Sequence, residues 1–218
     1  MSNSKTYANK LPHPPVDTSP PPSDGSDHAG TRPPSDTNCP EVDNSLVAIV
    51  PKDGDRHTAS AYPSFWFYIP YTVDDVETID FKLLDNNETQ TFHRTSVQLG
   101  HTPGILSVTL SPETSDSTSQ PNPLDPAIVY RWYLILNCHS DEPADENEIR
   151  TNDFEVTGLI SRIDANSDHL WDGVGYDELN HIASLYQANP QNRTYKLNWI
   201  ELLESIELEH LQAEPLLE

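Results

Sequence analysis

The sequence predicts a mainly β protein: an antiparallel β-sandwich of about seven strands, immunoglobulin-like or jelly-roll in type, with a small helical appendage at the C-terminal end. Three observations support this fold class. Seven short segments between residues 46 and 164 have the composition and alternation of strands. Turn-forming residues separate them, and helical periodicity appears only after residue 165. Because no amphipathic helix lies between the strand segments, parallel β-α-β units are excluded.

The strongest strand signal is SFWFYI at residues 64–69. Side chains alternate between the two faces of a strand, so Trp66 and Tyr68 point one way and residues 65, 67 and 69 point the other. Both faces are apolar. This pattern predicts a central strand that is covered on both sides, and Pro70 is expected to end its ladder of hydrogen bonds.

The other strand segments have shorter or more regular alternation. They are predicted at residues 46–50, 78–84, 89–99, 104–110, 129–138 and 154–163. Asp85-Asn86-Asn87 predicts a hairpin between the second and third of these, because Asp and Asn tolerate left-handed dihedrals. Residues 111–126 and the acidic residues 141–148 are expected to be loops. The strand order cannot be derived from these patterns.

Two short helices are predicted after the strands. Apolar residues from Tyr176 to Tyr186 fall at helical spacing, and Asn189-Pro190 is expected to end that helix. A second helix is predicted to begin near Asn198 as its N-cap. Its apolar stripe consists of Trp199, Leu202, Leu203 and Ile206, with Leu208 and Leu211 continuing beyond it. Such short helices are not stable alone, so we expect them to pack on each other and on the sandwich.

Three segments follow from these patterns. Residues 1–38 contain eight prolines and few apolar side chains, which predicts a disordered Pro-rich arm. Residues 39–165 are expected to form the β-sandwich, and residues 166–218 the helical appendage packed on it.

The formal net charge is −23, and residues 1–38 contribute only −1 of it. The acidity of the remaining chain opposes nucleic acid or an anionic membrane as a partner, because both are polyanions. A solvated acidic surface is the simplest interpretation, while a cationic partner is also compatible. No apolar run approaches the length of a membrane span, so no membrane insertion is predicted. The first residues, MSNSKTYANK, contain no apolar core of a signal peptide.

Several stretches of the sequence are similar to a known family. They are GTRPPSDTNCP (30–40), LVAIVP (46–51), YPSFWFYIPYT (62–72), HTPGILSVTL (101–110), YRWYLILNC (130–138), GLISRI (158–163), GYDELNHIASL (175–185) and NWIELLESIELEHLQAEP (198–215). In these motifs and their order the chain resembles the DUF928 family, a family of unknown function found mainly in cyanobacteria. The resemblance implies that members usually begin with a signal peptide. It implies no activity and no catalytic residues.

Cys39 and Cys138 are the only two cysteines. An even cysteine count and the export of similar proteins favour a disulfide between them, which would stabilise the fold by roughly 4 kcal/mol in the chain-entropy model. The alternative is two unrelated reduced thiols. A disulfide requires an oxidising compartment, so we expect a periplasmic or extracellular location, or a cytoplasmic one if the start of the chain is genuine.

No motif predicts a bound metal or cofactor. Asp164, Asn166, Asp168 and Asp172 are candidate ligands for a cation, but His169 occupies the position where a calcium loop requires glycine. A solvated connector is therefore the favoured interpretation.

No motif predicts catalysis either: no nucleophile elbow, P-loop or H-E-x-x-H is present, and we predict no catalytic residues. Among the aromatic residues, Tyr71 and Trp171 fall in predicted loops and are candidate ligand-binding residues. Our leading hypothesis is a non-enzymatic, extracytoplasmic binding or structural module for a protein or glycan partner. The alternative is an enzyme with a carboxylate or cation site at the junction of sandwich and helices. The oligomeric state stays open.

Overall fold

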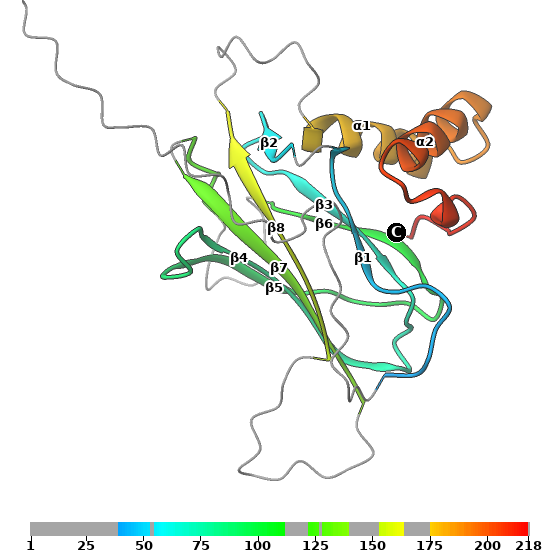
Figure 1. Cartoon of the computed structure of the whole chain (residues 1–218), viewed down its shortest axis with the longest axis horizontal. Helices are drawn as coiled ribbons and strands as arrows, with labels where there is room; N and C mark the ends of the chain where they lie inside the picture. The colour runs from blue at the N-terminus through cyan, green and yellow to red at the C-terminus, as the bar shows by residue number, and fades with distance from the viewer. Residues whose placement is uncertain are drawn as a thin grey trace, which may run out of the picture.

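The computed structural model describes residues 39–52, 55–111, 122–126, 128–139, 153–163 and 175–217. Its strands form two sheets, and its helices lie beside one of them (Figure 1). The three-stranded sheet has the order β1 (Val47–Ile49), β3 (Ser64–Ile69), β6 (Gly104–Thr109). The five-stranded sheet has the order β2 (His57–Thr58), β8 (Phe154–Arg162), β7 (Val129–Cys138), β4 (Val76–Asp85), β5 (Thr91–Ser96).

The prediction of a mainly β, largely antiparallel fold with C-terminal helices is confirmed. Each of the seven predicted segments contains a strand, and β3 and β7 have the predicted bounds. The additional strand, β2, pairs in parallel with β8 through two residues, His57 and Thr58. So short a strand has no alternation that sequence could reveal.

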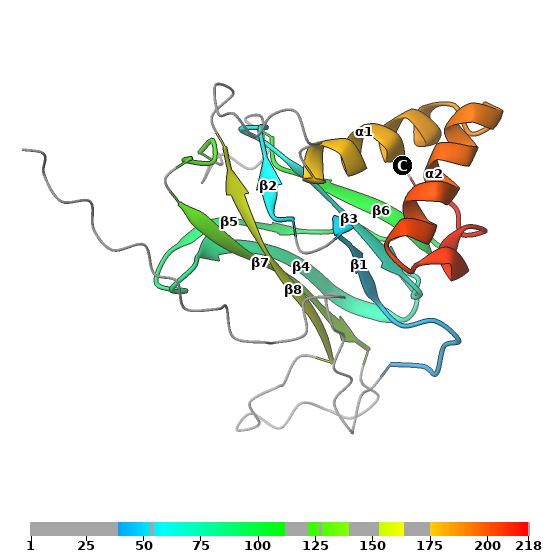
Figure 2. The ribbon, with the colours of Figure 1, turned by 45° about the horizontal axis from the view of Figure 1, so that its top comes forward.

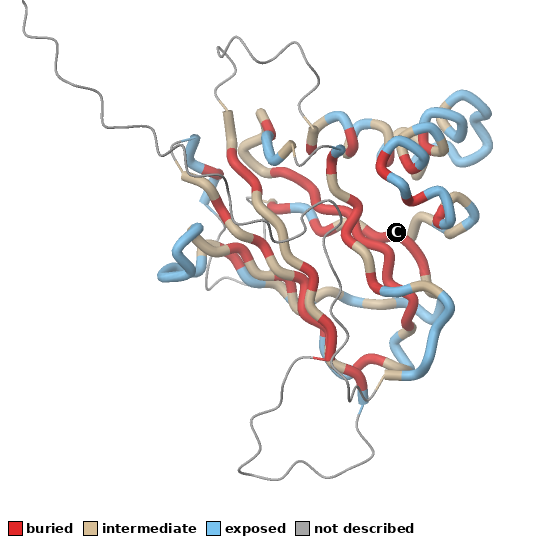
Figure 3. The backbone as a smooth tube through the Cα atoms, in the orientation of Figure 1, coloured by how far each residue is buried: buried red, intermediate tan, exposed pale blue. Residues whose placement is uncertain are grey.

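The main hydrophobic core lies between the two sheets. The rings of Phe65 and Phe67 from β3 face Phe81 on β4 and Trp132 on β7, with centroid distances of 4.8 to 6.3 Å. Burial is concentrated on the strands, while the outward sides of the helices are exposed (Figure 3). The inner faces of both sheets therefore supply the core that the alternating patterns predicted.

The helices cover the outer face of the three-stranded sheet. This layer consists of α1 (Gly175–Ala188), α2 (Arg193–Ser205) and the 3₁₀ turn η2 (Glu209–Leu211), as Figure 2 shows. Trp66 and Tyr68 point into it and join a second apolar cluster with Trp199. The indole nitrogen of Trp66 donates a hydrogen bond to Asn180 Oδ1 of α1 at 3.1 Å. All six residues of β3 are buried, so this strand is covered on both faces as predicted.

The prediction that α2 begins near Asn198 was wrong. The helix begins at Arg193, and Asn192 is its N-cap, accepting hydrogen bonds from the backbone of Thr194 and Tyr195. The error arises because the first turn carries no buried residue, while the apolar stripe begins at Trp199. A cap is set by backbone geometry, which the apolar pattern does not report. No helix in the described part of the chain is long and apolar enough to cross a bilayer.

Candidate functional site: the free edge of β6

The strand β6 forms one edge of the three-stranded sheet. It pairs with β3 on one side only, and Leu106 and Val108 lie opposite Phe67 and Phe65. On the other side, the N–H and C=O of Ile105 bond to the C-terminal segment and so point away from β3. Because alternate residues of a strand direct these groups to the same side, Ser107 and Thr109 also direct theirs to the open edge.

The C-terminal segment, defined here as residues 215–217, occupies the first position of this edge. The amide of Ile105 donates to the carbonyl of Pro215 at 2.8 Å, and the amide of Leu217 donates to the carbonyl of Ile105 at 2.7 Å. These bonds form a single parallel bridge centred on Leu216. Within the described residues, the backbone groups of Ser107 and Thr109 that face the same edge have no backbone partner.

Two residues determine where the C-terminal segment lies. Gly104 permits its close approach, because a Cβ atom there would lie 2.6 Å from the Pro215 carbonyl oxygen and 2.9 Å from Leu217 Cγ. Gln187, near the end of α1, donates a side-chain hydrogen bond to the carbonyl of Leu217. That carbonyl would otherwise be the next acceptor for the β6 edge in a parallel ladder. Pairing with this segment therefore stops after one bridge, and no other described residue pairs with the outward backbone groups of Ser107.

A groove of about 490 Å³ runs along the unpaired part of β6. Its walls are residues 95–98 and 100–102 on one side and Gln187 with Leu217 on the other, with residues 106–109 along β6 itself. Residues 95 and 96 belong to β5, the edge strand of the opposite sheet, so the groove opens between the two sheets. Its volume lies within the range of known binding pockets.

The chemistry of the groove is polar but uncharged. Its described lining consists of hydroxyl, amide, aliphatic and glycine residues with one histidine, His101, and includes no Asp, Glu, Lys, Arg, Trp, Tyr or Phe. His101 Nδ1 lies 3.3 Å from a carboxylate oxygen of Asp74, and both side chains are highly exposed. This lining suits backbone and side-chain hydrogen bonding, and it offers no aromatic surface on which a sugar could stack.

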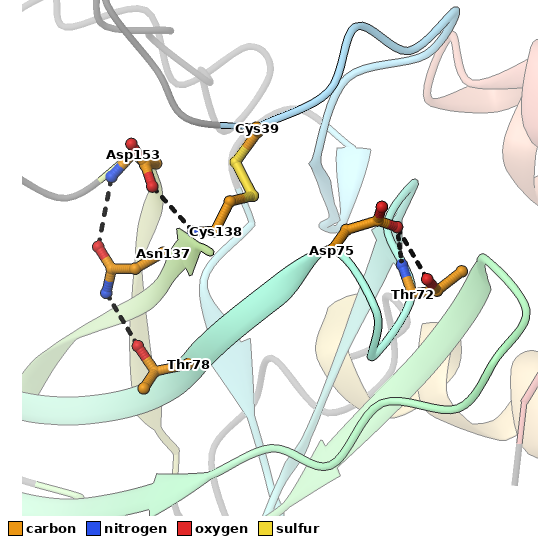
Figure 4. The surroundings of a disulfide bond; sticks show 7 residues. All are labelled: Cys39, Thr72, Asp75, Thr78, Asn137, Cys138 and Asp153. Carbon is orange, nitrogen blue, oxygen red and sulfur yellow. Dashed lines mark hydrogen bonds between the residues drawn. A yellow bond between two sulfur atoms is a disulfide. The ribbon is translucent and has the colours of Figure 1, made fainter. Parts of the chain in front are cut away.

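The disulfide lies elsewhere, at the end of β7 (Figure 4). Cys39 and Cys138 are joined with a Cα–Cα distance of 5.1 Å, as the sequence favoured. The buried carboxylate of Asp153 accepts a hydrogen bond from the Cys138 amide at 2.8 Å. Asn137 links the same strand end to β4, since its Nδ2 donates to Thr78 Oγ1 at 3.0 Å.

Potential metal ligands come together at this same place. Ligand atoms of Cys39, Cys138 and Asp153 lie within 4.8 Å of one another. Both sulfur atoms are bonded to each other, so only the carboxylate retains ligand capacity. The cation candidates Asp164, Asn166, Asp168 and Asp172 lie outside the described residues, as does Trp171.

Tyr71 is described, and it is not a surface residue. Its side chain is only 2% exposed, and its ring packs against Phe154 with a centroid distance of 5.6 Å. Burial, together with the nearby carboxylates of Asp153 and Asp75, raises the pKa of Tyr71 to about 12. Tyr71 therefore belongs to the core and offers no face to a ligand.

Carboxylates also gather at the junction of sandwich and helices, where the alternative hypothesis places an enzyme site. Asp177 accepts hydrogen bonds from Thr58 Oγ1 at 2.7 Å and from the Ala59 amide at 2.6 Å. Asp55 accepts one from the Gly175 amide at 3.1 Å, and its other oxygen lies 2.7 Å from His57 Nδ1. Both carboxylates join β2 to the start of α1, so their arrangement anchors the helix.

Sequence reasoning missed the groove and the residues that shape it. Ser107, Thr109 and Gln187 have no distinctive pattern, because their importance follows from β6 being an edge strand. Asp153 was also missed, because its contact with Cys138 appears only in the fold.

The comparisons with known proteins identify a family but no activity. The model of a domain of unknown function, DUF928, matches residues 27–216. The chain belongs to the DUF928 family. Searches of curated proteins and of solved structures found no match. The described part of this DUF928 protein thus provides geometry for a functional proposal where the family provides none.

Proposed function

We propose that this DUF928 protein is a non-enzymatic binding module that recognises an extended segment of a partner protein by adding it as a strand to β6. The observation that carries the proposal is the pair of outward-facing residues, Ser107 and Thr109, whose backbone groups border the groove without a backbone partner among the described residues. Exposed strand edges are templates for pairing with another chain, and strand addition is an established mode of peptide recognition.

The chain itself supplies a precedent for such pairing. Residues 215–217 are seated on the first position of the edge as extended backbone, with Leu216 packed toward the helices and Leu217 toward the sandwich core. Alternate side chains of an added strand would continue this arrangement over Ser107 and Thr109. A partner segment with small or apolar residues at alternating positions fits the lining.

We also propose, from the strand order, that the sandwich is of the immunoglobulin-like type. The order β1-β3-β6 opposite β2-β8-β7-β4-β5 matches strands A, B and E opposite G, F, C and C′, with the two-residue β2 as an additional strand beside β8. Near the start of β7, the hydroxyl of Tyr130 accepts a hydrogen bond from the Asp125 amide at 2.9 Å, which resembles the tyrosine corner of such domains. Strand D would lie next to β6, so an added strand would occupy its place.

Charge indicates which partner the groove takes. The chain carries a formal charge of −23, so a second copy or a nucleic acid would be repelled at long range. The groove itself is uncharged. We therefore infer an extended segment that is neutral where it enters the groove and flanked by Lys or Arg. A glycan has less support, because no Trp, Tyr or Phe appears in the described lining.

The disulfide supports a periplasmic or extracellular location for this module. Disulfides persist in oxidising compartments and are rare in reducing ones. The Cys39–Cys138 bond closes a separation of 99 residues and ties the entry of the sandwich to the end of β7. Binding through a strand edge would then take place outside the cytoplasm.

A display library of linear peptides about a dozen residues long tests the proposal, because strands in proteins are usually shorter than this. We expect the protein to select peptides whose affinity falls about tenfold or more in Ser107→Pro, which removes one outward N–H donor. Proline is tolerated on an edge strand when its nitrogen faces away from the ladder. The matched control, Ser107→Ala, retains the donor and should bind as the wild type does.

Two outcomes would contradict the proposal. Equal peptide binding by the proline and alanine variants would overturn strand addition, as would selection of glycans instead of peptides on an array. Circular dichroism and tryptophan fluorescence check folding. If the proline variant fails to fold, Ser107→Lys places a charged side chain on the edge strand while retaining every backbone group, and such a residue should weaken strand pairing.

The enzyme alternative has less structural support. The carboxylates of Asp55 and Asp177 already accept hydrogen bonds from backbone amides. These bonds hold the chain in place and leave the carboxylates less available to exchange protons with a substrate. We therefore retain the binding module as the conclusion.

A further inference from the structure

We propose that the C-terminal segment, residues 215–217, is a displaceable strap that regulates access to the β6 edge. This inference rests on the proposed function, since it concerns the same edge. Three residues of β6 direct their backbone groups outward, namely Ile105, Ser107 and Thr109, and the strap takes the first of them. A partner strand that pairs along the whole of this short edge must therefore displace the strap.

The strap is held by few contacts. Two backbone hydrogen bonds join it to Ile105, and one side-chain bond from Gln187 holds the carbonyl of Leu217. Its two leucines are only partly buried, unlike Leu211 in the preceding turn, which is fully buried. Local opening of a segment with few buried contacts requires much less free energy than opening of the core. The strap can thus open while η2 stays packed.

Gln187 holds the strap through one side-chain hydrogen bond to the Leu217 carbonyl. It diverts the Leu217 carbonyl from β6, so the strap cannot extend its own ladder to Ser107. The remaining edge stays open as a starting point for a partner. A strand that first pairs with Ser107 and Thr109 could then replace the strap at Ile105. The partner would form two backbone hydrogen bonds with Ile105 in place of the two that the strap loses.

Population arithmetic gives the expected size of the effect. A ligand that needs the open form binds more weakly in proportion to the fraction of molecules that are open. Loss of one or two hydrogen bonds from the strap should raise that fraction about tenfold. Variants that weaken the strap should therefore bind a partner segment about tenfold more tightly.

The test uses the full chain and a peptide selected from the library described above. Its dissociation constant is measured for the wild type and for Leu217→Pro, which removes the amide that donates to Ile105. Gln191→Ala, an exposed substitution outside the groove lining, is the control. We expect about tenfold tighter binding in Leu217→Pro and no change in the control.

Hydrogen exchange reports the strap directly. Peptide binding to the wild type should accelerate exchange of the Leu217 amide while protecting that of Ser107. Gly104→Ala should accelerate exchange of Leu217 without any peptide, because the added Cβ would lie 2.6 Å from the Pro215 carbonyl oxygen. Gly100→Ala, with no atom within 4 Å of its Cβ, is the matched control.

The outcomes separate the two proposals. If peptides bind in a Ser107-dependent manner while Leu217 stays protected and Leu217→Pro binds no better, the strap is refuted and strand addition stands. If no selected peptide depends on Ser107, strand addition fails and the strap has no role in it. Tighter binding by Leu217→Pro, together with faster exchange of the Leu217 amide when the wild type binds peptide, supports both proposals.

Discussion

The indole nitrogen of Trp132, on β7, donates a hydrogen bond to the hydroxyl of Tyr176, on α1, at 2.9 Å. That hydroxyl in turn donates to the carbonyl of Leu159 on β8 at 3.3 Å. Burial is the main cause that raises the pKa of Tyr176 well above its usual value, so it stays neutral and able to donate. The first turn of α1 thus reaches the sandwich core, and the helical layer and the sandwich share a buried polar link.

Tyr176→Phe should lower the free energy of unfolding by about 1–3 kcal/mol, because the Trp132 N–H and the Leu159 carbonyl lose a buried partner. Urea denaturation followed by tryptophan fluorescence measures the change. Tyr195→Phe is the control, since it removes a hydroxyl from a less buried tyrosine on α2. Equal stability of the two variants would mean that the buried hydrogen bond contributes little.

Gly158 is the position on β8 that makes room for the Trp132 ring. A Cβ atom there would lie 2.3 Å from Trp132 Cζ2, which is much closer than van der Waals contact permits. Gly158→Ala should therefore destabilise the protein by about 1–3 kcal/mol or more through overpacking. Thermal unfolding should show a lower Tm, whereas Gly100→Ala should leave Tm almost unchanged. A normal Tm for Gly158→Ala would show that the indole can shift at little cost.

The central elements of this fold were predictable from local pattern alone. The six residues of β3 are apolar on both faces, and that fact predicted a strand between two layers before either layer was known. The bounds of β7 followed from the alternation of Tyr130, Trp132 and Leu134 with more polar neighbours. Long, periodic segments can be predicted in this way because every further residue repeats the same alternation between the two faces of the strand.

Edges and caps were less predictable, for a physical reason. Ser107 and Thr109 alternate with apolar residues as any half-buried strand does, and only the strand order makes β6 an edge. The order depends on contacts between distant segments. Likewise, the choice of Asn192 over Asn198 as the N-cap depends on backbone geometry at a turn without apolar residues. The core could therefore be predicted from the sequence, whereas the candidate site could be found only once the strand order was known.

The disulfide should contribute substantially to stability. Linking Cys39 to Cys138 restricts the unfolded chain across a separation of 99 residues, which corresponds to about 4 to 5 kcal/mol in the chain-entropy model. A Cys39→Ser, Cys138→Ser variant should unfold at much lower urea concentration than the wild type, and reductant should affect only the wild type. Intact mass should rise by about two hydrogens on reduction. Free alkylation of both thiols in protein purified without reductant would contradict the bond.

His93 should make stability depend on pH. Its side chain lies on β5, is only 8% exposed, and faces Phe81 with a centroid distance of 6.4 Å. Burial lowers the pKa of His93, because the charged imidazolium is poorly solvated there. The unfolded chain, with a histidine pKa of about 6.5, therefore binds a proton more readily than the folded one.

Stability from this cause is fully present above the unfolded pKa and is lost as pH falls below about 6.5. Urea midpoints measured between pH 7.5 and pH 5 should decrease for the wild type, and the decrease should be smaller for His93→Gln. That variant will be less stable at every pH, so the slope is the relevant quantity. His181→Gln, which changes an exposed histidine of α1, should retain the wild-type slope. If His93→Gln and the wild type lose stability in parallel, the buried imidazole is not the cause, and the pH dependence must arise from other groups.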